Sequence, residues 1–355
     1  MYNATVRYRE ATPQLDVFSL LSHEQAVTQV IKGINKLSKV IDWELFREEL
    51  ESILGYAQRD WSKGGRPPID PVLMFKVLVL QKFHGLSDEE CEFQMRDRFS
   101  FMIFLGLHPG DAVPDARTIW DFKQALERDG RDGARKLFER FEQMLTERGL
   151  IGRKGSIVDA SFVDASFVDA PRQRNSRKEN EQIKEGERPE GFEERSAKGR
   201  QKDCDARWAK KNKEMHFGYK NHVKVDAKKK LVTDYKTTEA NVHDSQVFKE
   251  LVDEKDEAVL ADSAYLSEEA REHLLECNCE DFIQLKGYRN HPLSQEDKKR
   301  NRLRSRIRVR VEHVFGRMSQ LAMDRLRTIG KERAHHHNGL SNLVYNMDRY
   351  AFLMK

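Results

Sequence analysis

Apolar positions follow one rhythm in the first part of this chain and another after about residue 150. Up to that point they recur at helical spacing. Beyond it come short apolar runs that alternate with period two or are bounded by turn residues, a pattern typical of strands. We therefore expect an all-helical region over 1–150 and a mixed sheet flanked by helices over 151–355, of the α+β or α/β class.

The helical region has recognisable ends. An apolar helix over Pro71–His84 begins at Pro and is ended by Gly85, and Ser87 to Glu90 has the Ser-x-x-Glu form of a capping box. Two further helices are expected, one after Asp115 and one over 134–148. Short helices with sharp turns, preceded by the basic run 63–68, fit a DNA-binding module of helix-turn-helix type and a helical packing or dimerisation domain equally well.

The second region is expected to contain strands and helices in the order of a mixed sheet. The expected strands are 156–169, 217–225, 231–237, 258–261 and 281–285, and the expected helices are 245–252, 267–277 and a terminal one. In this order the first strand and strand 258–261 lie side by side. Residues 171–213 form a hydrophilic insert that is too long for an ordinary compact loop, so we expect it to be flexible and to order on nucleic acid.

Positive charge is concentrated in two segments, although the net charge is only +4. Residues 171–213 carry 14 Lys and Arg against 9 Asp and Glu, and residues 286–310 carry 10 against 2. A merely solvated surface does not account for five arginines between Arg302 and Arg310. The distribution indicates a surface that binds a polyanion, with nucleic acid as the expected partner.

Three separated acids are the candidate catalytic residues. Asp159 follows the apolar residues Ile157-Val158, Asp262 ends the run 258–262, and Glu312 lies in the basic segment. Each also has a non-catalytic explanation, as a turn residue, a helix cap or a solvated side chain. Adjacent first and later strands, with the last helix crossing them, would bring all three together, as in a two-metal phosphoryl-transfer site.

A tandem repeat complicates the first acid. Residues 159–163 and 164–168 are both Asp-Ala-Ser-Phe-Val. A shift of five residues turns a strand side chain to the opposite face, so only one of Asp159 and Asp164 can face the site. We prefer Asp159, because the chain enters this strand tightly from Gly155 and leaves it into a long insert that absorbs extra residues. Asp164 is the rival.

The segment around Glu312 has two readings. Arginines at alternate positions from 302 to 310 formally indicate a strand. Apolar residues at helical spacing continue for longer, and we expect a helix on that ground. They are Ile307, Val311, Val314, Phe315, Met318 and Leu321.

The remaining features are less informative. No apolar stretch approaches the roughly 18 residues of a membrane span, and the first residues lack the order of a signal peptide. A cytoplasmic protein is expected. The four cysteines have no zinc-like spacing, and free thiols are expected.

Several runs together resemble bacterial insertion-sequence transposases of the DDE type, specifically the insertion-sequence-five group. The runs are 65–68, 157–161, 205–208, 217–222, 240–245, 260–265 and 308–312. The resemblance implies an RNase H-like catalytic domain after an N-terminal DNA-binding domain. It also implies that Asp159 (or Asp164), Asp262 and Glu312 are the metal ligands, with Arg308 as the family's Arg. The family pattern has Tyr and Lys where this chain has Ser305 and Ser319.

The implied reaction is cleavage of DNA at the ends of the element, followed by strand transfer. Two Mg²⁺ or Mn²⁺ ions, roughly 3.5–4 Å apart in such sites, would be held by the three carboxylates. The partners would be the terminal inverted repeats and target DNA, bound by a homodimer. Candidate DNA-binding residues are Arg66, Arg207, Trp208, Lys220, His222, Lys298, Arg302, Arg304, Arg306, Arg308 and Arg310.

Two alternatives remain open. The repeat and the two serines are compatible with an inactive transposase-derived protein that binds DNA without cutting it. A metal-dependent nuclease of the same fold would cut DNA without joining it.

Overall fold

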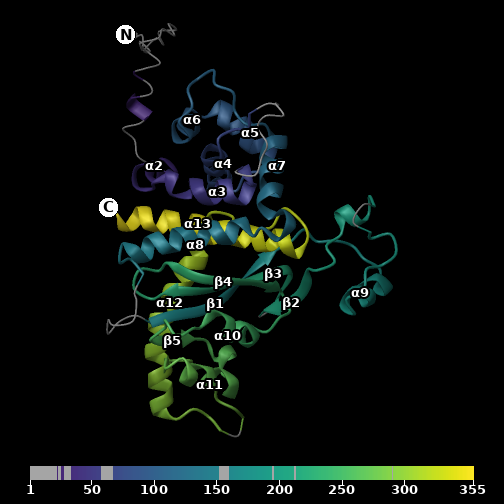
Figure 1. The fold of residues 1–355 in the computed structure, drawn as a ribbon. Coiled ribbons are helices and arrows are strands. Elements are labelled where there is room, and N and C mark those ends of the chain that lie inside the picture. Colours follow the sequence, from purple (N-terminus) through teal and green to yellow (C-terminus); the bar gives the residue numbers. More distant parts are fainter. Residues whose placement is uncertain are drawn as a thin grey trace, which may run out of the picture.

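The computed structural model describes residues 22, 25–27, 33–56, 67–151, 160–193, 196–211, 213–289 and 291–355. It contains an N-terminal group of helices followed by a mixed sheet with helices on both faces (Figure 1). The expected fold class is therefore confirmed, and the arrangement is consistent with an RNase H-like domain. None of the described helices is long and apolar enough to span a membrane.

The helices of the first part begin and end where local chemistry predicts. The α-helices are α2 (Asn35–Val40), α3 (Arg47–Leu54), α4 (Pro71–His84), α5 (Asp88–Asp97), α6 (Phe99–Leu105), α7 (Ala116–Glu127) and α8 (Gly133–Glu147). Asp70 caps α4 by accepting hydrogen bonds from the N–H groups of residues 72 and 73, and Gly85 ends it in the left-handed conformation. Ser87 caps α5 as the motif predicts.

The sheet has the strand order of the expected domain. Its strands are β1 (Ala160–Asp169), β2 (Arg207–Lys211), β3 (Glu214–Asp226), β4 (Val232–Glu239), β5 (Ala258–Ala261) and β6 (Glu280–Asp281). Strand β1 is central, antiparallel to β3 on one side and parallel to β5 on the other. β6 continues beside β5, whereas β2 and β4 both pair with β3. The expected adjacency of the first strand and strand 258–261 is confirmed.

Two pairs of helices cover the sheet. Helices α10 (Phe248–Leu251) and α11 (Glu268–Glu276) pack through one apolar cluster with Val163 and Val259. The opposite face is covered by α12 (Gln295–Gln320) and α13 (Lys331–Leu353). The basic segment around Glu312 is thus helical, as the longer apolar periodicity predicts.

Helix α13 is the centre of the molecule. It lies beside α8 between the sheet and the N-terminal helices (Figure 1), and nearly all its residues from Ala334 to Ala351 are buried. A single apolar cluster runs from the N-terminal helices through α8 and α13 to β3 and β4. The helical region and the sheet therefore share one core.

Three asparagines on α13 fix its position on the sheet. They are spaced one helical turn apart and fully buried: Asn338, Asn342 and Asn346. Asn342 exchanges amide hydrogen bonds of 3.0 and 3.2 Å with Asn221 of β3. Asn346 accepts from the N–H of Val232 at 2.8 Å and donates to its carbonyl at 2.7 Å. Asn338 donates to the Thr237 hydroxyl at 2.9 Å, and its Oδ1 has no partner among the described atoms. The paired amides of Asn342 and Asn346 therefore specify the register of helix on sheet.

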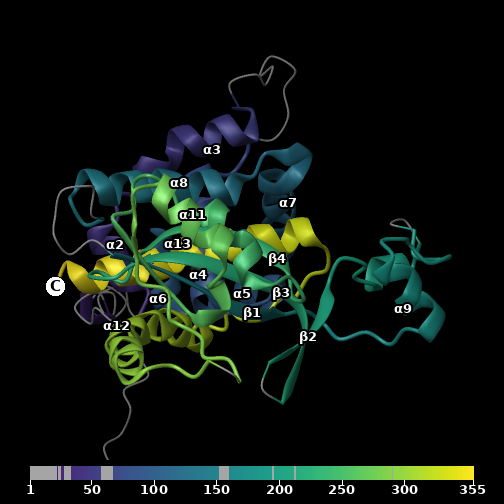
Figure 2. The same ribbon diagram turned by 90° about the horizontal axis from the view of Figure 1, so that it is seen from below.

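The insert 171–213 has local structure that the sequence pattern did not predict. It contains helix α9 (Arg177–Lys184), opened by a capping box of Ser176 and Glu179, and it protrudes from one side of the body (Figures 1 and 2). Asp203 attaches it, being fully buried and accepting from the Tyr219 hydroxyl at 2.8 Å and from the Gly330 N–H at 2.9 Å. The C-terminal end of the insert is thus joined to β3 and to the start of α13.

Replacing Asn346 by Ala should lower the free energy of unfolding by about 2–4 kcal/mol, because both backbone groups of Val232 lose a buried partner. Urea denaturation followed by circular dichroism measures this. The matched control is Asn241→Ala at an exposed loop position, expected to change stability by less than about 0.5 kcal/mol. Equal effects of the two substitutions would contradict a register role for Asn346.

Candidate active site

Two aspartates lie at neighbouring positions on the parallel strands β1 and β5. Val163 pairs with Ala261, so the residues that follow them, Asp164 and Asp262, come next along the two strands. Asp262 ends its strand and caps the turn behind it, its Oδ1 accepting from the N–H of Ser263 at 2.5 Å. Asp159, which the sequence analysis preferred, lies outside the described residues. Asp164 is therefore the member of the repeat that the structure shows beside Asp262.

Asp164 is a buried carboxylate in a charged environment. Its side chain is 16% exposed, its Oδ1 accepts from the N–H of Ala165 at 2.8 Å, and its Oδ2 accepts from Arg308 at 3.0 Å. Burial raises the pKa of Asp164 above its usual value, and the nearby charge of Asp262 adds to that rise, whereas Arg308 opposes it. Two acids are thus held together where a cation is favourable.

Helix α12 places Arg308 and Glu312 over these strands. The two residues are one turn apart, and the Arg308 guanidinium is 3.5 Å from Oε1 of Glu312, so it lies between that carboxylate and Asp164. The Glu312 side chain is 57% exposed. Among the described residues no three acidic, His or Cys side chains converge closely enough to hold a metal ion. Arg308 thus occupies the space between the acids that the sequence analysis grouped.

The donor chemistry of these residues fits a hard divalent cation. Asp164, Asp262 and Glu312 offer only carboxylate oxygens, the ligands that Mg²⁺ and Mn²⁺ prefer. Burial is the main cause of the raised pKa of Asp164, and the charge of Asp262 adds to it; a bound cation would favour the charged form against both effects. Glu312 is exposed and lies one helical turn after Arg308, which contacts Asp164.

The helix divides the five alternating arginines between two faces. Arg304 donates to the carbonyl of Ile283 at 2.5 Å, and Arg308 contacts Asp164, so these two point inward. Arg302 and Arg306 are exposed together with Lys298. Arg310 is exposed overall but donates to the carbonyl of Ala227 at 3.1 Å. The positive charge that is exposed to solvent on this helix therefore comes mainly from Arg302, Arg306 and Lys298.

Two of the expected DNA-binding residues face the interior on β3. His222 is 0% exposed and its Nε2 lies 2.8 Å from the Thr238 hydroxyl. Burial lowers its pKa to about 4. Lys220 is bound to Asp244 at 2.7 Å and to the carbonyl of Val242. The buried His222 ring has no surface to offer to DNA and contacts the neighbouring strand β4 instead, whereas Lys220 holds the sheet to the segment before α10.

Of the other residues expected to bind DNA, one is used within the protein and one is exposed. Arg207 donates to the carbonyls of Cys204, Ala206 and Ile183, which makes it a clamp within the insert. Trp208 is 45% exposed and packs on Phe217. Arg66 lies outside the described residues.

Tyr265 is a site residue that the sequence analysis did not single out. It is fully buried, and its hydroxyl has no hydrogen-bond partner among the described atoms. Burial raises its pKa, and the charges of Asp244, Asp164 and Asp262 contribute to that rise. A Tyr three residues after Asp262 was visible in the run 260–265, but its orientation depends on the turn that follows β5.

Removing the guanidinium beside Asp164 should move the carboxyl pKa further up. In Arg308→Gln the favourable charge interaction is lost while burial remains, so the titration midpoint of Asp164 shifts to higher pH. Carbon NMR of labelled aspartates in metal-free protein measures the midpoint. Arg306→Gln, at an exposed position on the same helix, is the control and should leave it unchanged. An unchanged midpoint in Arg308→Gln would exclude this pairing in solution.

Comparison with known families agrees with this arrangement. The family model described as "Transposase DDE domain" matches residues 156–347, which is more than half of the chain and includes β1, β5 and α12. A second model, "Transposase domain (DUF772)", matches residues 24–125 in the helical region. No solved structure matches the chain. The chain therefore belongs to the DDE transposase family, whose members are phosphoryl-transfer enzymes that act on DNA.

Proposed function

We propose that this transposase cleaves DNA at the ends of an insertion sequence and joins the freed 3′ ends to target DNA. The observation that carries the proposal is the juxtaposition of Asp164 and Asp262 on parallel strands beneath Arg308 and Glu312 of α12. We further assign the chain to the insertion-sequence-five group, because the sequence runs 260–265 and 308–312 resemble those of that group.

Asp164, Asp262 and Glu312 would hold the divalent metal that the family uses, with Mg²⁺ or Mn²⁺ as the ion and two ions as the expected number. When bound, the metal supplies charge neutralisation at the phosphate and a lower pKa for the attacking water or hydroxyl. We assign to Asp164 the role that the sequence analysis preferred for Asp159; the support is that Asp164 follows Val163, which pairs with Ala261.

Other residues of this chain orient the site and bind the substrate. Arg308 neutralises Asp164 in the metal-free protein and is near enough to Glu312 to pair with it instead. Lys298, Arg302 and Arg306 line the open side of α12, where they would bind backbone phosphates of the DNA ends. A homodimer would hold both ends of the element.

One alternative has support from particular residues. Ser305 and Ser319 stand where the family pattern has Tyr and Lys, and both are engaged within the protein, Ser305 with Gln284 and Ser319 with Asp324. Together with the separation of Glu312 from the two aspartates, this favours a protein that binds DNA without cutting it. A DNA cleavage assay with the wild-type protein and its Asp262→Asn variant decides between the two functions.

Asp262→Asn should abolish cleavage of a labelled duplex that carries the DNA flanking the gene, because one negative charge is removed from the metal ligands. Binding of the same duplex should remain close to that of the wild type. The assay compares Mg²⁺, Mn²⁺ and EDTA and follows the joining of released 3′ ends to other DNA. If the wild type binds the duplex but does not cleave it in either metal, the inactive transposase-derived DNA-binding protein is favoured. Cutting without joining would favour a nuclease.

The two halves of the repeat can be separated by matched substitutions. We expect Asp164→Asn to abolish cleavage and Asp159→Asn to retain it, because Asp164 lies beside Asp262. A second readout is thermal stabilisation by Mn²⁺, which at a concentration of 100 Kd should amount to about 2.7 kcal/mol for a single site. It should persist in Asp159→Asn and disappear in Asp164→Asn. The reverse pattern would assign the site to Asp159.

A further inference from the structure

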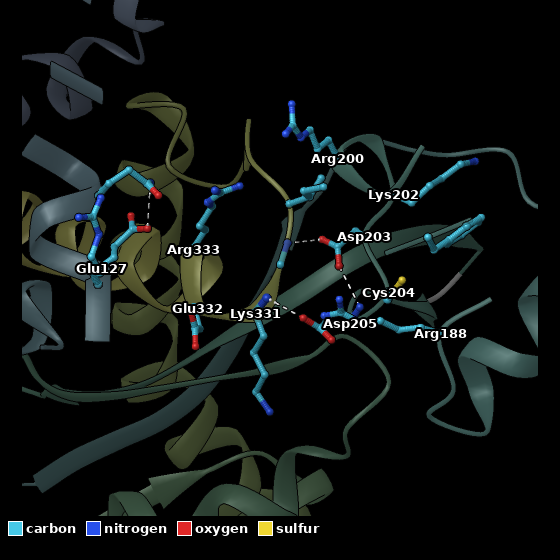
Figure 3. Close-up of a pocket in the computed structure, with 16 residues that line it drawn as sticks. Glu127, Arg188, Arg200, Lys202, Asp203, Cys204, Asp205, Lys331, Glu332 and Arg333 are labelled. Carbon is cyan, nitrogen blue, oxygen red and sulfur yellow. Dashed lines mark hydrogen bonds between the residues drawn. The ribbon is translucent and has the colours of Figure 1, made fainter. Parts of the chain in front are cut away.

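A continuous groove runs along α7, away from the candidate active site. It consists of two hollows of about 630 and 310 Å³ that share Gln124, Glu127 and Arg333. The larger lies between the end of α7, the start of α13 and the insert (Figure 3). The smaller lies between α4, α5, α7 and the segment 322–328. Helix α7 therefore forms one wall along both hollows.

Four of the cations that line the groove have no partner among the described residues. Arg128, Arg200 and Arg325 are exposed, and Arg333 is half-buried between the two hollows. Within the part of the chain that the structure describes, none of these four guanidinium groups makes a hydrogen bond or ion pair. In Figure 3 no dashed line joins the side chains of Arg200 and Arg333 to the other residues drawn.

Three acids of the groove are held by the fold. Asp203 and Asp205 accept from the first N–H groups of α13, those of Gly330 at 2.9 Å and Lys331 at 3.1 Å (Figure 3). These contacts place both carboxylates at the positive end of the helix. Burial raises the pKa of Glu127 to about 7 and so reduces its negative charge at neutral pH.

Two further acids of the groove, Glu89 and Glu332, are exposed in the first turns of α5 and α13. Over both hollows, ten Lys and Arg residues stand against six Asp and Glu residues. The net charge of the lining is therefore positive.

The floor of the smaller hollow holds one further amine. Lys82 is half-buried there with its Nζ 2.8 Å from Nδ1 of His337. Burial, together with the neighbouring charges of Lys123 and Arg327, lowers the pKa of Lys82 to about 7, so this amine is only partly charged at neutral pH and an anion beside it would favour its charged form. Cations that repel one another in a partly desolvated groove are stabilised by an anionic ligand.

The spacing of the cations indicates an extended ligand. They extend through both hollows along α7 instead of converging on one point, so a single small anion would engage only part of the set. The same face of α7 exposes Trp120 beside Arg117, a pair suited to contact with sugars and bases. An extended strand of phosphates fits this arrangement.

We propose that one backbone of duplex DNA lies in this groove along α7, with phosphates bound by Arg325 at the α5 end, by Arg333 between the two hollows, and by Arg128 and Arg200 at the insert end. This contact is separate from the basic face of α12. It rests on the proposed function in that the ligand is the DNA on which the transposase acts. The N-terminal helices and the insert thus bind the same strand, although they are far apart in sequence.

The test measures binding of a short random-sequence duplex to the full-length protein in EDTA over a range of salt concentrations. Replacing Arg128, Arg200 and Arg333 together by Gln should lower affinity at least about tenfold at about 0.1 M salt, and should reduce the slope of log K against log salt by about 2–3. The matched control replaces Lys249, Lys255 and Arg271 by Gln, three exposed cations around α10 and α11. It removes the same charge and should leave both quantities near the wild-type values.

A second readout uses the native cysteines. Cys204 lines the larger hollow and is partly exposed, whereas Cys91, Cys277 and Cys279 are buried. Bound duplex should slow alkylation of Cys204 severalfold, and should do so less in the double variant Arg128→Gln with Arg200→Gln. That variant changes only exposed side chains, so it also serves if the triple variant fails to fold.

The outcomes separate this inference from the proposed function. Tight binding with unchanged affinity, slope and Cys204 alkylation in the groove variants would overturn the groove and leave the transposase proposal standing. An equal loss in the groove and control variants would show that net charge alone drives binding, and would also overturn it. A wild type that binds no duplex would contradict the proposed function itself.

Discussion

The burial of α13 is the constraint on which the rest of the structure depends. This helix lies between the sheet and the N-terminal helices, so a single apolar core serves both regions. Apolar contacts alone would allow the helix to slide along the sheet, because they have little directionality. The amides of Asn342 and Asn346 remove that freedom, since an unpaired buried amide costs about 1–3 kcal/mol. The end of the chain thereby fixes how the helical region is oriented relative to the catalytic strands.

Two clusters of like charge on this framework have opposite signs. Asp164 and Asp262 are held together by the pairing of β1 with β5, and Arg308 offsets only part of their repulsion. Along α7 the cations around Lys82 and Arg333 are held together by packing of the helical region on α13. In both places the backbone holds groups of like charge closer together than they would be in solution. Each cluster is therefore suited to a counter-ion supplied from outside, a metal in one and a phosphate backbone in the other.

Helix α12 connects the candidate site to the protein surface through its periodicity. In a strand the alternating arginines from 302 to 310 would all point the same way. In the helix Arg304 and Arg308 turn toward the sheet, and Arg302 and Arg306 turn toward solvent. One basic segment thus supplies both a guanidinium that neutralises a buried acid and an exposed surface for phosphates.

The sequence by itself determined most of the elements and their order, although it missed α9 and β2 in the insert and predicted strand 281–285 where β6 has only Glu280–Asp281. Apolar periodicity and end signals such as Pro71, Gly85 and Ser87 act within a few residues, so they placed α4 and α5 correctly and identified α12 as a helix. The candidate acids Asp262 and Glu312 were visible for the same reason. Only the tertiary structure decided which aspartate of the repeat lies beside Asp262, because the register of β1 on β5 depends on pairing between distant segments. The burial of His222, the asparagine row of α13 and the groove along α7 likewise depend on packing between elements far apart in the chain, which local pattern does not encode.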